Sequence, residues 1–216
     1  MGRLRLGRVV HEQASLFSGD DAEAGERQEF VGGEVVYMPG FVPADDRDAV
    51  LARIDETTVW RQELIRMYGK EMPVPRLTAW HGDPGRTYSY SQIALEPVPW
   101  TGPLLALKAM VEAACGVGFN SVLLNRYRDG RDSVAWHSDD EPELGPRPVI
   151  ASVSLGASRR FHLRRKADHG DRVDITLAHG SLLLMAGSTQ HEWEHQVPKT
   201  ATKVGPRVNL TFRTIT

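Results

Sequence analysis

NRYRDGRDSVAWHSDDE, residues 125–141, contains an H-x-D pair formed by His137 and Asp139. In an extended strand, residues two positions apart point to the same face, so this imidazole and this carboxylate would converge on one point. His195, in the distant segment WEHQVP, is the best candidate for a third ligand. Two histidines and one carboxylate on one face of a metal, with the opposite face open, are the arrangement expected of a non-haem Fe(II) oxygenase. For H-x-D alone, a turn with a surface His and Asp is the alternative.

The segment PRVNLTFR, residues 206–213, alternates with a period of two. One face carries Val208, Leu210 and Phe212, which predicts packing against a core. The other face carries four polar side chains, those of Arg207, Asn209, Thr211 and Arg213. Two guanidinium groups on one face have the fork geometry that binds carboxylates. A strand with a solvated polar face is the alternative interpretation.

Four motifs occur together in one order along the chain: N-x-Y at 125–127, H-x-D-D-E at 137–141, the distal His195, and R-x-N-x-T-x-R at 207–213. On these motifs the sequence resembles the AlkB-type Fe(II)/2-oxoglutarate dioxygenases, most of all the members that repair alkylated bases in DNA. The resemblance extends from Arg66 to Arg213. It implies a double-stranded β-helix, a jelly-roll or cupin-like core that is mainly β with flanking helices (α+β).

Size and composition predict one globular domain. The chain has 216 residues, of which 41% are hydrophobic and 25% charged, enough for one sizeable core and too few for two ordinary domains. Residues 1–30 are charged and lack a sustained period, so we expect a mobile N-terminal tail followed by a single domain over 31–216. The net charge of −2 gives no global basic field, so a nucleic-acid partner would need a local basic patch.

Cysteine content and hydropathy bear on the compartment. The single cysteine, Cys115, excludes an intramolecular disulfide and a Cys-rich zinc site, and a buried small hydrophobe is a better interpretation than a nucleophile. Nothing resembles a signal peptide or a membrane span. We therefore expect a soluble monomer in a reducing compartment, the nucleoid-associated cytoplasm of a bacterium or the nucleus of a eukaryote.

The remaining patterns predict two helices and many short strands. Helices are expected over 43–56 and over 103–115, the second because Pro103 opens it and Gly116 follows its end. Strands are expected at 34–38, 122–127, 149–155, 160–163, 173–177, 181–185 and 207–215. Short strands separated by regular Gly-containing turns predict a sandwich or a barrel, and the resemblance selects the double-stranded β-helix.

The resemblance also implies the contents of the site. Fe(II) would be held by His137, Asp139 and His195, and 2-oxoglutarate and O₂ would take the three positions left free. Arg207 would bind the far carboxylate of 2-oxoglutarate. The remaining cosubstrate contacts would come from Asn125, Tyr127, Asn209, Thr211 and Arg213. The alternative for Asn125 and Tyr127 is that they end a buried strand with satisfied polar groups.

Residues 60–92 are implied to form a lid that recognises the nucleotide. A hairpin at 66–70 would place Met67 and Tyr68 in the gap left by a flipped base, with Gly69 at its turn and Lys70 near a phosphate. The other implied substrate contacts of the lid are Arg76, Tyr88, Tyr90 and Ser91. An ordinary Gly turn and an exposed Tyr/Ser hairpin are the alternatives for these two stretches.

Two charged segments are further candidates for substrate contacts. Asp140 and Glu141 follow the ligand pair, and in the family such acids contact a flipped, cationic base; a solvated acidic turn is the alternative. Arg159 and Arg160 begin a basic run that continues at 164–166. This run could follow a phosphate backbone, although a charge run is commonly only a solvated face.

The segment QASLF, Gln13–Phe17, resembles the short bacterial motif that docks on the DNA sliding clamp. An apolar pair that pins the tail onto its own domain is the alternative for Leu16 and Phe17. His191 lies four residues before His195, but the family places the ligand before a short x-Val-Pro step, which selects His195.

Together these features predict direct reversal of alkylation damage on N1-methyladenine and N3-methylcytosine in DNA. The first alternative is an RNA, tRNA or protein demethylase with the same chemistry. The second is a catalytically inactive nucleic-acid-binding module, against which the intact ligands and arginines argue.

Overall fold

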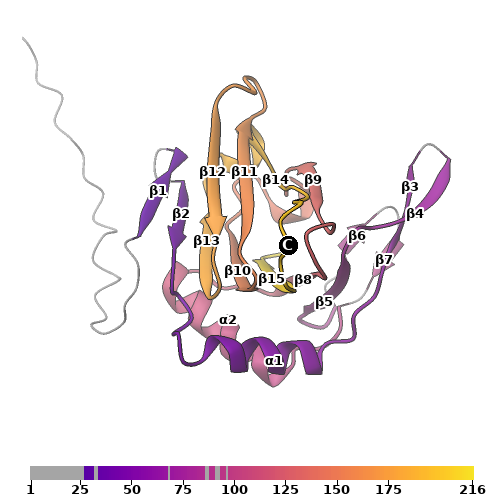
Figure 1. Ribbon diagram of the computed structural model, residues 1–216, viewed down its shortest axis with the longest axis vertical. Helices are drawn as coiled ribbons and strands as arrows, with labels where there is room; N and C mark the ends of the chain where they lie inside the picture. Colours follow the sequence, from indigo (N-terminus) through magenta and orange to yellow (C-terminus); the bar gives the residue numbers. More distant parts are fainter. Residues whose placement is uncertain (1–26, 32–33, 68, 86–87, 91–92, 96) are drawn as a thin grey trace, which may run out of the picture.

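Two antiparallel β-sheets form the body of the protein in the computed structural model, which describes residues 27–216 except 32–33, 68, 86–87, 91–92 and 96 (Figure 1). The seven-stranded sheet has the order β1-β2-β13-β10-β15-β8-β5, and the four-stranded sheet has the order β12-β11-β14-β9. The larger sheet comprises β1 (Gln28–Phe30), β2 (Val35–Met38), β5 (Leu77–Gly82), β8 (Ser121–Tyr127), β10 (Ile150–Gly156), β13 (Ser181–Met185) and β15 (Arg207–Arg213). The smaller comprises β9 (Val134–His137), β11 (Arg159–Arg165), β12 (Arg172–Leu177) and β14 (Trp193–Val197). This is the mainly β architecture with flanking helices that the sequence predicted.

Two helices lie along the outer side of the larger sheet (Figure 1). Helix α2 (Gly102–Cys115) has Pro103 in its first turn and ends at Gly116, whose φ of 68° is the left-handed conformation that favours glycine. Helix α1 (Arg47–Thr57) begins four residues later than predicted, because residues 43–46 form a turn closed by hydrogen bonds to the carbonyl of Pro43. Neither helix in the described part of the chain is long and apolar enough to cross a membrane.

Two hydrophobic clusters fill the space on either side of the larger sheet. The outer cluster joins Ile54 and Leu104 of the helices to Val208, Leu210 and Phe212 of β15, the apolar face predicted for that segment. The inner cluster lies between the sheets and contains Tyr127, Phe161, Leu163, Met185 and Trp193 among others. Side chains of β15 therefore alternate between the helix layer and the space between the sheets. All seven residues of β15 are buried, which excludes a solvated polar face.

Two short hairpins extend from the end of the larger sheet at β5 (Figure 1). Strands β3 (Leu64–Met67) and β4 (Lys70–Pro73) pair around Gly69, whose φ is 77°, as expected for the turn. Strands β6 (Tyr88–Tyr90) and β7 (Ile93–Leu95) form the second hairpin. Both belong to the segment predicted to recognise the nucleotide.

Two smaller expectations concern the chain before β2 and the lone thiol. The sequence analysis counted Gln28–Phe30 with the N-terminal tail. These residues form β1 and pair with β2, so the domain begins before the predicted boundary at residue 31. Residues 1–26 of the expected tail lie outside the described residues.

Cys115 is half-buried, and burial raises the pKa of its thiol to about 12, so the thiolate needed for a nucleophile does not form at neutral pH.

Candidate active site

His137, Asp139 and His195 meet between the two sheets. His137 ends β9 and is the direct cross-strand partner of His195 on β14, with their ring centroids 4.3 Å apart. The potential ligand atoms of the three residues all lie within 4.8 Å of one another. The sequence analysis assumed that Asp139 lies within an extended strand. In the structure it lies two residues beyond the end of β9. The predicted metal site is thus assembled, although its carboxylate lies on the irregular segment after β9 and not on the strand.

Hydrogen bonds hold His137 and Asp139 in place. The ring Nδ1 of His137 lies 2.9 Å from the carbonyl oxygen of Ala135, so the tautomer that donates there leaves Nε2 unprotonated toward Asp139. The backbone N–H of Asp139 donates to Oε1 of Gln190 over 2.9 Å, and its Oδ1 accepts a 2.7 Å hydrogen bond from Arg213. Such partners orient metal ligands before the metal arrives.

Burial and charge set the protonation states that a metal requires. Burial, reinforced by the neighbouring His137, lowers the pKa of His195 to about 3, so this imidazole is neutral at physiological pH. Burial alone would raise the pKa of Asp139, but the charge of Arg213 and the two histidines outweigh it, and the pKa is lowered. A neutral imidazole and an ionised carboxylate are the forms that bind Fe(II).

A cavity of about 510 Å³ opens on the ligand side of the site. All three ligands line it, so a metal held there would keep coordination positions facing the open space. Its wall also includes Asn125 and Tyr127 on β8, together with Asn209, Thr211 and Arg213 on β15. The sequence predicted these residues as cosubstrate contacts, and the structure brings them into one chamber.

Arg207 lies buried beside Tyr127, one of the residues that line this chamber. It is 1% exposed, and its guanidinium lies over the ring of Tyr127 at 4.9 Å. One Nη donates to the hydroxyl of Ser154 over 2.9 Å, while its Nε and other Nη have no hydrogen-bond partner among the described residues. Burying a guanidinium with unused donors is costly unless an anion completes it. A carboxylate is the group that fits this fork, which agrees with the far end of 2-oxoglutarate.

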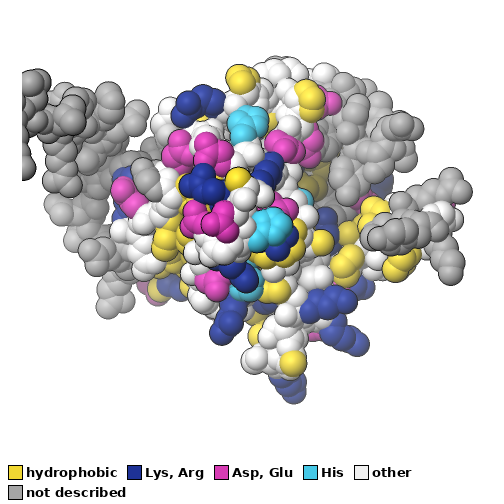
Figure 2. Space-filling model, turned by 90° about the horizontal axis from the view of Figure 1, so that it is seen from above, with side chains coloured by type: hydrophobic (Ala, Val, Ile, Leu, Met, Phe, Trp, Pro, Cys, Tyr) yellow, Lys and Arg dark blue, Asp and Glu magenta, His cyan; other side chains and the backbone are white. Residues whose placement is uncertain are grey.

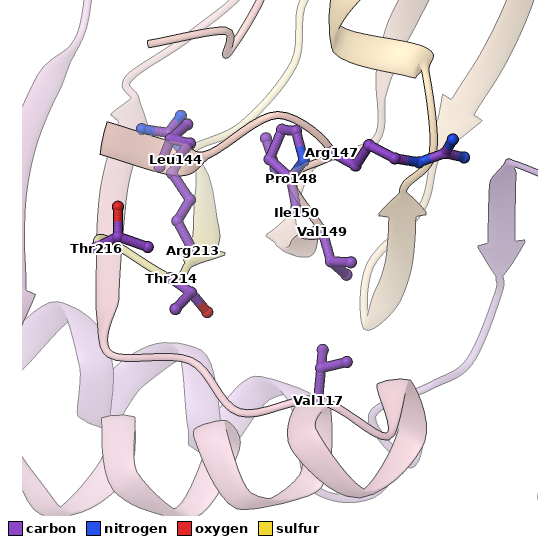
Figure 3. A pocket seen from close by; sticks show the side chains of 9 residues that line it. All are labelled: Val117, Leu144, Arg147, Pro148, Val149, Ile150, Arg213, Thr214 and Thr216. Atoms are coloured by element: carbon purple, nitrogen blue, oxygen red, sulfur yellow. The ribbon is translucent and has the colours of Figure 1, made fainter. Parts of the chain in front are cut away.

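Arg213 forms part of two walls. Besides the main chamber it lines a smaller cavity of about 220 Å³, which lies between residues 144–150 and residues 213–216 (Figure 3). Figure 3 shows its side chain rising from β15 toward Leu144. Through its bond to Asp139, this guanidinium holds the metal-binding carboxylate in place.

Comparisons with known proteins agree with this geometry. A sequence model described as the 2OG-Fe(II) oxygenase superfamily matches residues 34–213. The chain belongs to the 2OG-Fe(II) oxygenase superfamily. Members use Fe(II), 2-oxoglutarate and O₂, and the triad and Arg207 supply the donors that the metal and the diacid need. The resemblance on which the sequence argument depended is therefore confirmed.

Several relatives of this oxygenase are known by name. The chain is 47% identical over 190 residues to mouse "Alpha-ketoglutarate-dependent dioxygenase alkB homolog 3", covering 84% of the chain and 66% of the relative. It is 44% identical over 158 residues to human "DNA oxidative demethylase ALKBH2", covering 70% of the chain and 60% of the relative. The chain thus spans just under two thirds of the length of the first of these relatives. A structure titled "The structure of OsALKBH1" shares the fold at 19% identity, with a TM-score of 0.63 over 84% of this chain and 98% of that one.

The expected substrate contacts are less uniformly placed in the oxygenase. Arg76 lines the chamber, and its Nε donates to Oδ1 of Asn125 over 2.7 Å, so it connects the lid segment to a cosubstrate residue. Tyr68 and Ser91 lie outside the described residues. The side chains of Met67, Lys70, Tyr88 and Tyr90 are likewise outside the description, and their roles stay predictions.

Two neighbouring acids point in different directions. Glu141 lines the chamber. Asp140 is exposed and accepts a 3.1 Å hydrogen bond from Lys166. Of the two acids proposed to contact a base, Glu141 is therefore the one that the structure places at the chamber.

The predicted basic patch is largely neutralised. Arg159 is 3% exposed and cannot contact a phosphate, so its assignment to DNA is wrong. Arg160 is exposed on the outer face of β11, where its role stays a prediction. Farther along, Arg164 pairs with Glu194 and Arg165 with Asp171 and Glu192. Figure 2 shows the same mixing, with Lys and Arg side chains beside Asp and Glu at the centre of the visible face.

Gln190 is a functional residue that the sequence did not indicate. It lies on the short helix α3 (Thr189–Glu192), is 1% exposed, and accepts the hydrogen bond from the Asp139 N–H. A single Gln that is 51 positions from its partner leaves no pattern in the sequence. Because Asp139 lies outside β9, this hydrogen bond fixes the backbone that carries the carboxylate.

Replacing Gln190 with Ala is expected to weaken Fe(II) binding by about 10- to 100-fold, the usual effect of losing a partner of a metal ligand. Metal affinity, measured by calorimetry with Mn(II) under the same buffer conditions, tests this. Gln196→Ala is the matched control, because Gln196 lies on β14 but contacts His162 instead. Equal affinities in the two variants would show that Gln190 does not position Asp139.

Proposed function

We propose that the protein oxidatively demethylates N-alkylated bases in DNA, N1-methyladenine and N3-methylcytosine, and thereby reverses alkylation damage directly. The observation that carries the proposal is the His137, Asp139 and His195 triad on the wall of a chamber of about 510 Å³, with the unused donors of the buried Arg207 beside Tyr127 of the same wall. The name "DNA oxidative demethylase" borne by relatives at 44% identity supports the nucleic-acid substrate.

When bound, Fe(II), 2-oxoglutarate and O₂ supply the oxidising chemistry, in which the diacid is converted to succinate and CO₂ while a methyl C–H is hydroxylated. The chain contributes placement. His137, Asp139 and His195 hold the metal on one side, and Arg207 anchors the far carboxylate so that the oxo acid points toward the triad. The hydroxymethyl group on the base nitrogen then leaves as formaldehyde, which restores the unmodified base.

Residues on the remaining side of the chamber suit a flipped, cationic base. Trp80 and Ile65 supply apolar surface, and Glu141 supplies a carboxylate. Methylation at N1 of adenine or N3 of cytosine leaves a positive charge on the ring, and a carboxylate in a cavity that excludes water favours it over a neutral base. Expulsion of water by the lid segment would strengthen this preference.

The test is formaldehyde release from methylated oligonucleotides with Fe(II) and 2-oxoglutarate. Single- and double-stranded DNA and the matching RNA sequences, each with one methylated base, form the panel, and His137→Ala is the inactive control. Release from DNA with loss in the control supports the proposal. Release only from RNA would support the RNA demethylase, and binding without release would support an inactive binding module.

We also infer that Gln13–Phe17 docks the protein onto a DNA sliding clamp. The motif lies outside the described residues, and support comes only from its sequence. Clamp pull-down is expected to be lost with Leu16→Ala plus Phe17→Ala, because these side chains would fill the apolar pocket. Unchanged pull-down by the double variant would refute the inference.

A further inference from the structure

Arg159 lies inside the protein, behind the cosubstrate end of the chamber. Its guanidinium donates to three backbone carbonyl oxygens, those of Asp129 (3.2 Å), Asp132 (2.9 Å) and Pro198 (2.6 Å). The first two belong to the β8–β9 connection, and the third follows β14. One side chain on β11 therefore ties together the two connections that flank this end of the chamber.

Tyr127 links this side chain to the expected site of the far carboxylate. The guanidinium carbon of Arg159 lies 5.6 Å from the centre of the Tyr127 ring, and that of Arg207 lies 4.9 Å from it. Two guanidinium groups thus contact one aromatic ring, an arrangement that fixes the ring through cation–π attraction. Burial lowers the pKa of both arginines, but guanidinium groups stay charged in proteins, so two positive charges remain.

Carboxylates of the described residues do not bond to either of these two guanidinium groups. The Asp132 carboxylate accepts from Arg128, and the Asp129 carboxylate accepts from Arg131. Arg159 is left with neutral carbonyl partners, and Arg207 with the Ser154 hydroxyl. The charges of Asp129 and Asp132 act on Arg159 against the effect of burial on its pKa, but both carboxylates already pair with other arginines. A bound carboxylate would neutralise the positive charge that remains.

We propose that Arg159 is a positioning residue for 2-oxoglutarate, which holds Tyr127 in place and adds a second positive charge behind the far-carboxylate site. The inference rests on the proposed 2-oxoglutarate-dependent activity. It assigns to Arg159 a role opposite to the nucleic-acid contact expected from its place in a basic run. Its neighbour Arg160 points to the other face of β11 and serves as the matched control.

The test compares Arg159→Gln, Arg159→Lys and Arg160→Gln in the metal-loaded protein without nucleic acid and without O₂. The dissociation constant for 2-oxoglutarate, from calorimetric titration, is expected to rise about 10- to 100-fold in Arg159→Gln, the range for losing a charge-assisted interaction. Arg159→Lys keeps the charge but not the fork, so a smaller rise is expected. Arg160→Gln is expected to stay within about twofold of the wild type.

A second ligand separates this role from a loss of structure. 2-Oxobutanoate carries the same metal-binding oxo acid but lacks the far carboxylate, so its affinity is expected to be equal in wild type and Arg159→Gln. Equal weakening of both ligands, or unchanged binding of 2-oxoglutarate, would overturn the inference. If Arg159→Gln does not fold, Arg159→Lys decides between these outcomes by the same ratio. Wild-type protein that binds no 2-oxoglutarate would instead refute the proposed function.

Discussion

Replacing His195 with Ala is expected to abolish metal binding and to lower formaldehyde release by at least about a thousandfold, which corresponds to an increase of about 4 kcal/mol in activation free energy. The imidazole is 5% exposed and neutral, so its lone pair is available to the metal without the loss of a proton. Ala leaves two ligands, one of which is half-exposed. Calorimetric titration with Mn(II), alongside formaldehyde release from methylated DNA, measures both effects.

His191→Ala is the matched control for this experiment. His191 lies four residues earlier, is exposed, and contacts the carbonyl of Pro146 rather than the triad. Activity near the wild-type level is therefore expected. A large loss in His191→Ala with His195→Ala still active would show that the wrong histidine has been assigned to the metal.

Replacing Arg207 with Gln is expected to raise the dissociation constant for 2-oxoglutarate by about 100-fold or more, because truncating one member of a buried charge pair costs about 2–5 kcal/mol. The two unpartnered donors of this guanidinium are the groups that the far carboxylate would complete. Anaerobic calorimetric titration of the metal-loaded variant gives the constant. Arg207→Lys keeps the charge but not the fork, so most of the loss is expected there too.

Arg172→Gln serves as the control for the effect of removing a cation. Arg172 is exposed on β12, lies 4.0 Å from Asp174 and is not among the residues that line the chamber. Its cosubstrate affinity is expected to match the wild type. Wild-type affinity in Arg207→Gln would show that the far carboxylate binds elsewhere, and the assignment of the two arginines to the two ends of the diacid would fail.

Periodic segments were predictable because burial imposes their pattern. The alternation in β15 places Val208, Leu210 and Phe212 in the core and turns the polar face, with Asn209, Thr211 and Arg213, to the chamber, as the sequence indicated. Helix α2 was equally clear, because Pro103 and Gly116 mark its two ends. Fold and metal ligands therefore followed from local chemistry together with a family resemblance.

Single long-range contacts were not predictable, because they leave no periodic trace. Arg159 and Arg160 are neighbouring residues of the same type, yet Arg159 is buried and Arg160 is exposed. Charge alone cannot distinguish them, because the side of β11 on which each lies depends on the packing of Phe161 and Leu163. The role of Gln190 was not predicted for a related reason, because its partner Asp139 is 51 positions away in the sequence.

The place of β15 within the larger sheet has a consequence for biosynthesis. This strand follows every other strand of the described chain, yet it lies between β10 and β8. A nascent polypeptide leaves the ribosome from its N-terminus, so β8 and β10 emerge long before the neighbour that joins them. Frameshifts or premature stops upstream of Arg213 would leave two strands with open hydrogen-bonding edges, and such products would be prone to aggregation and degradation.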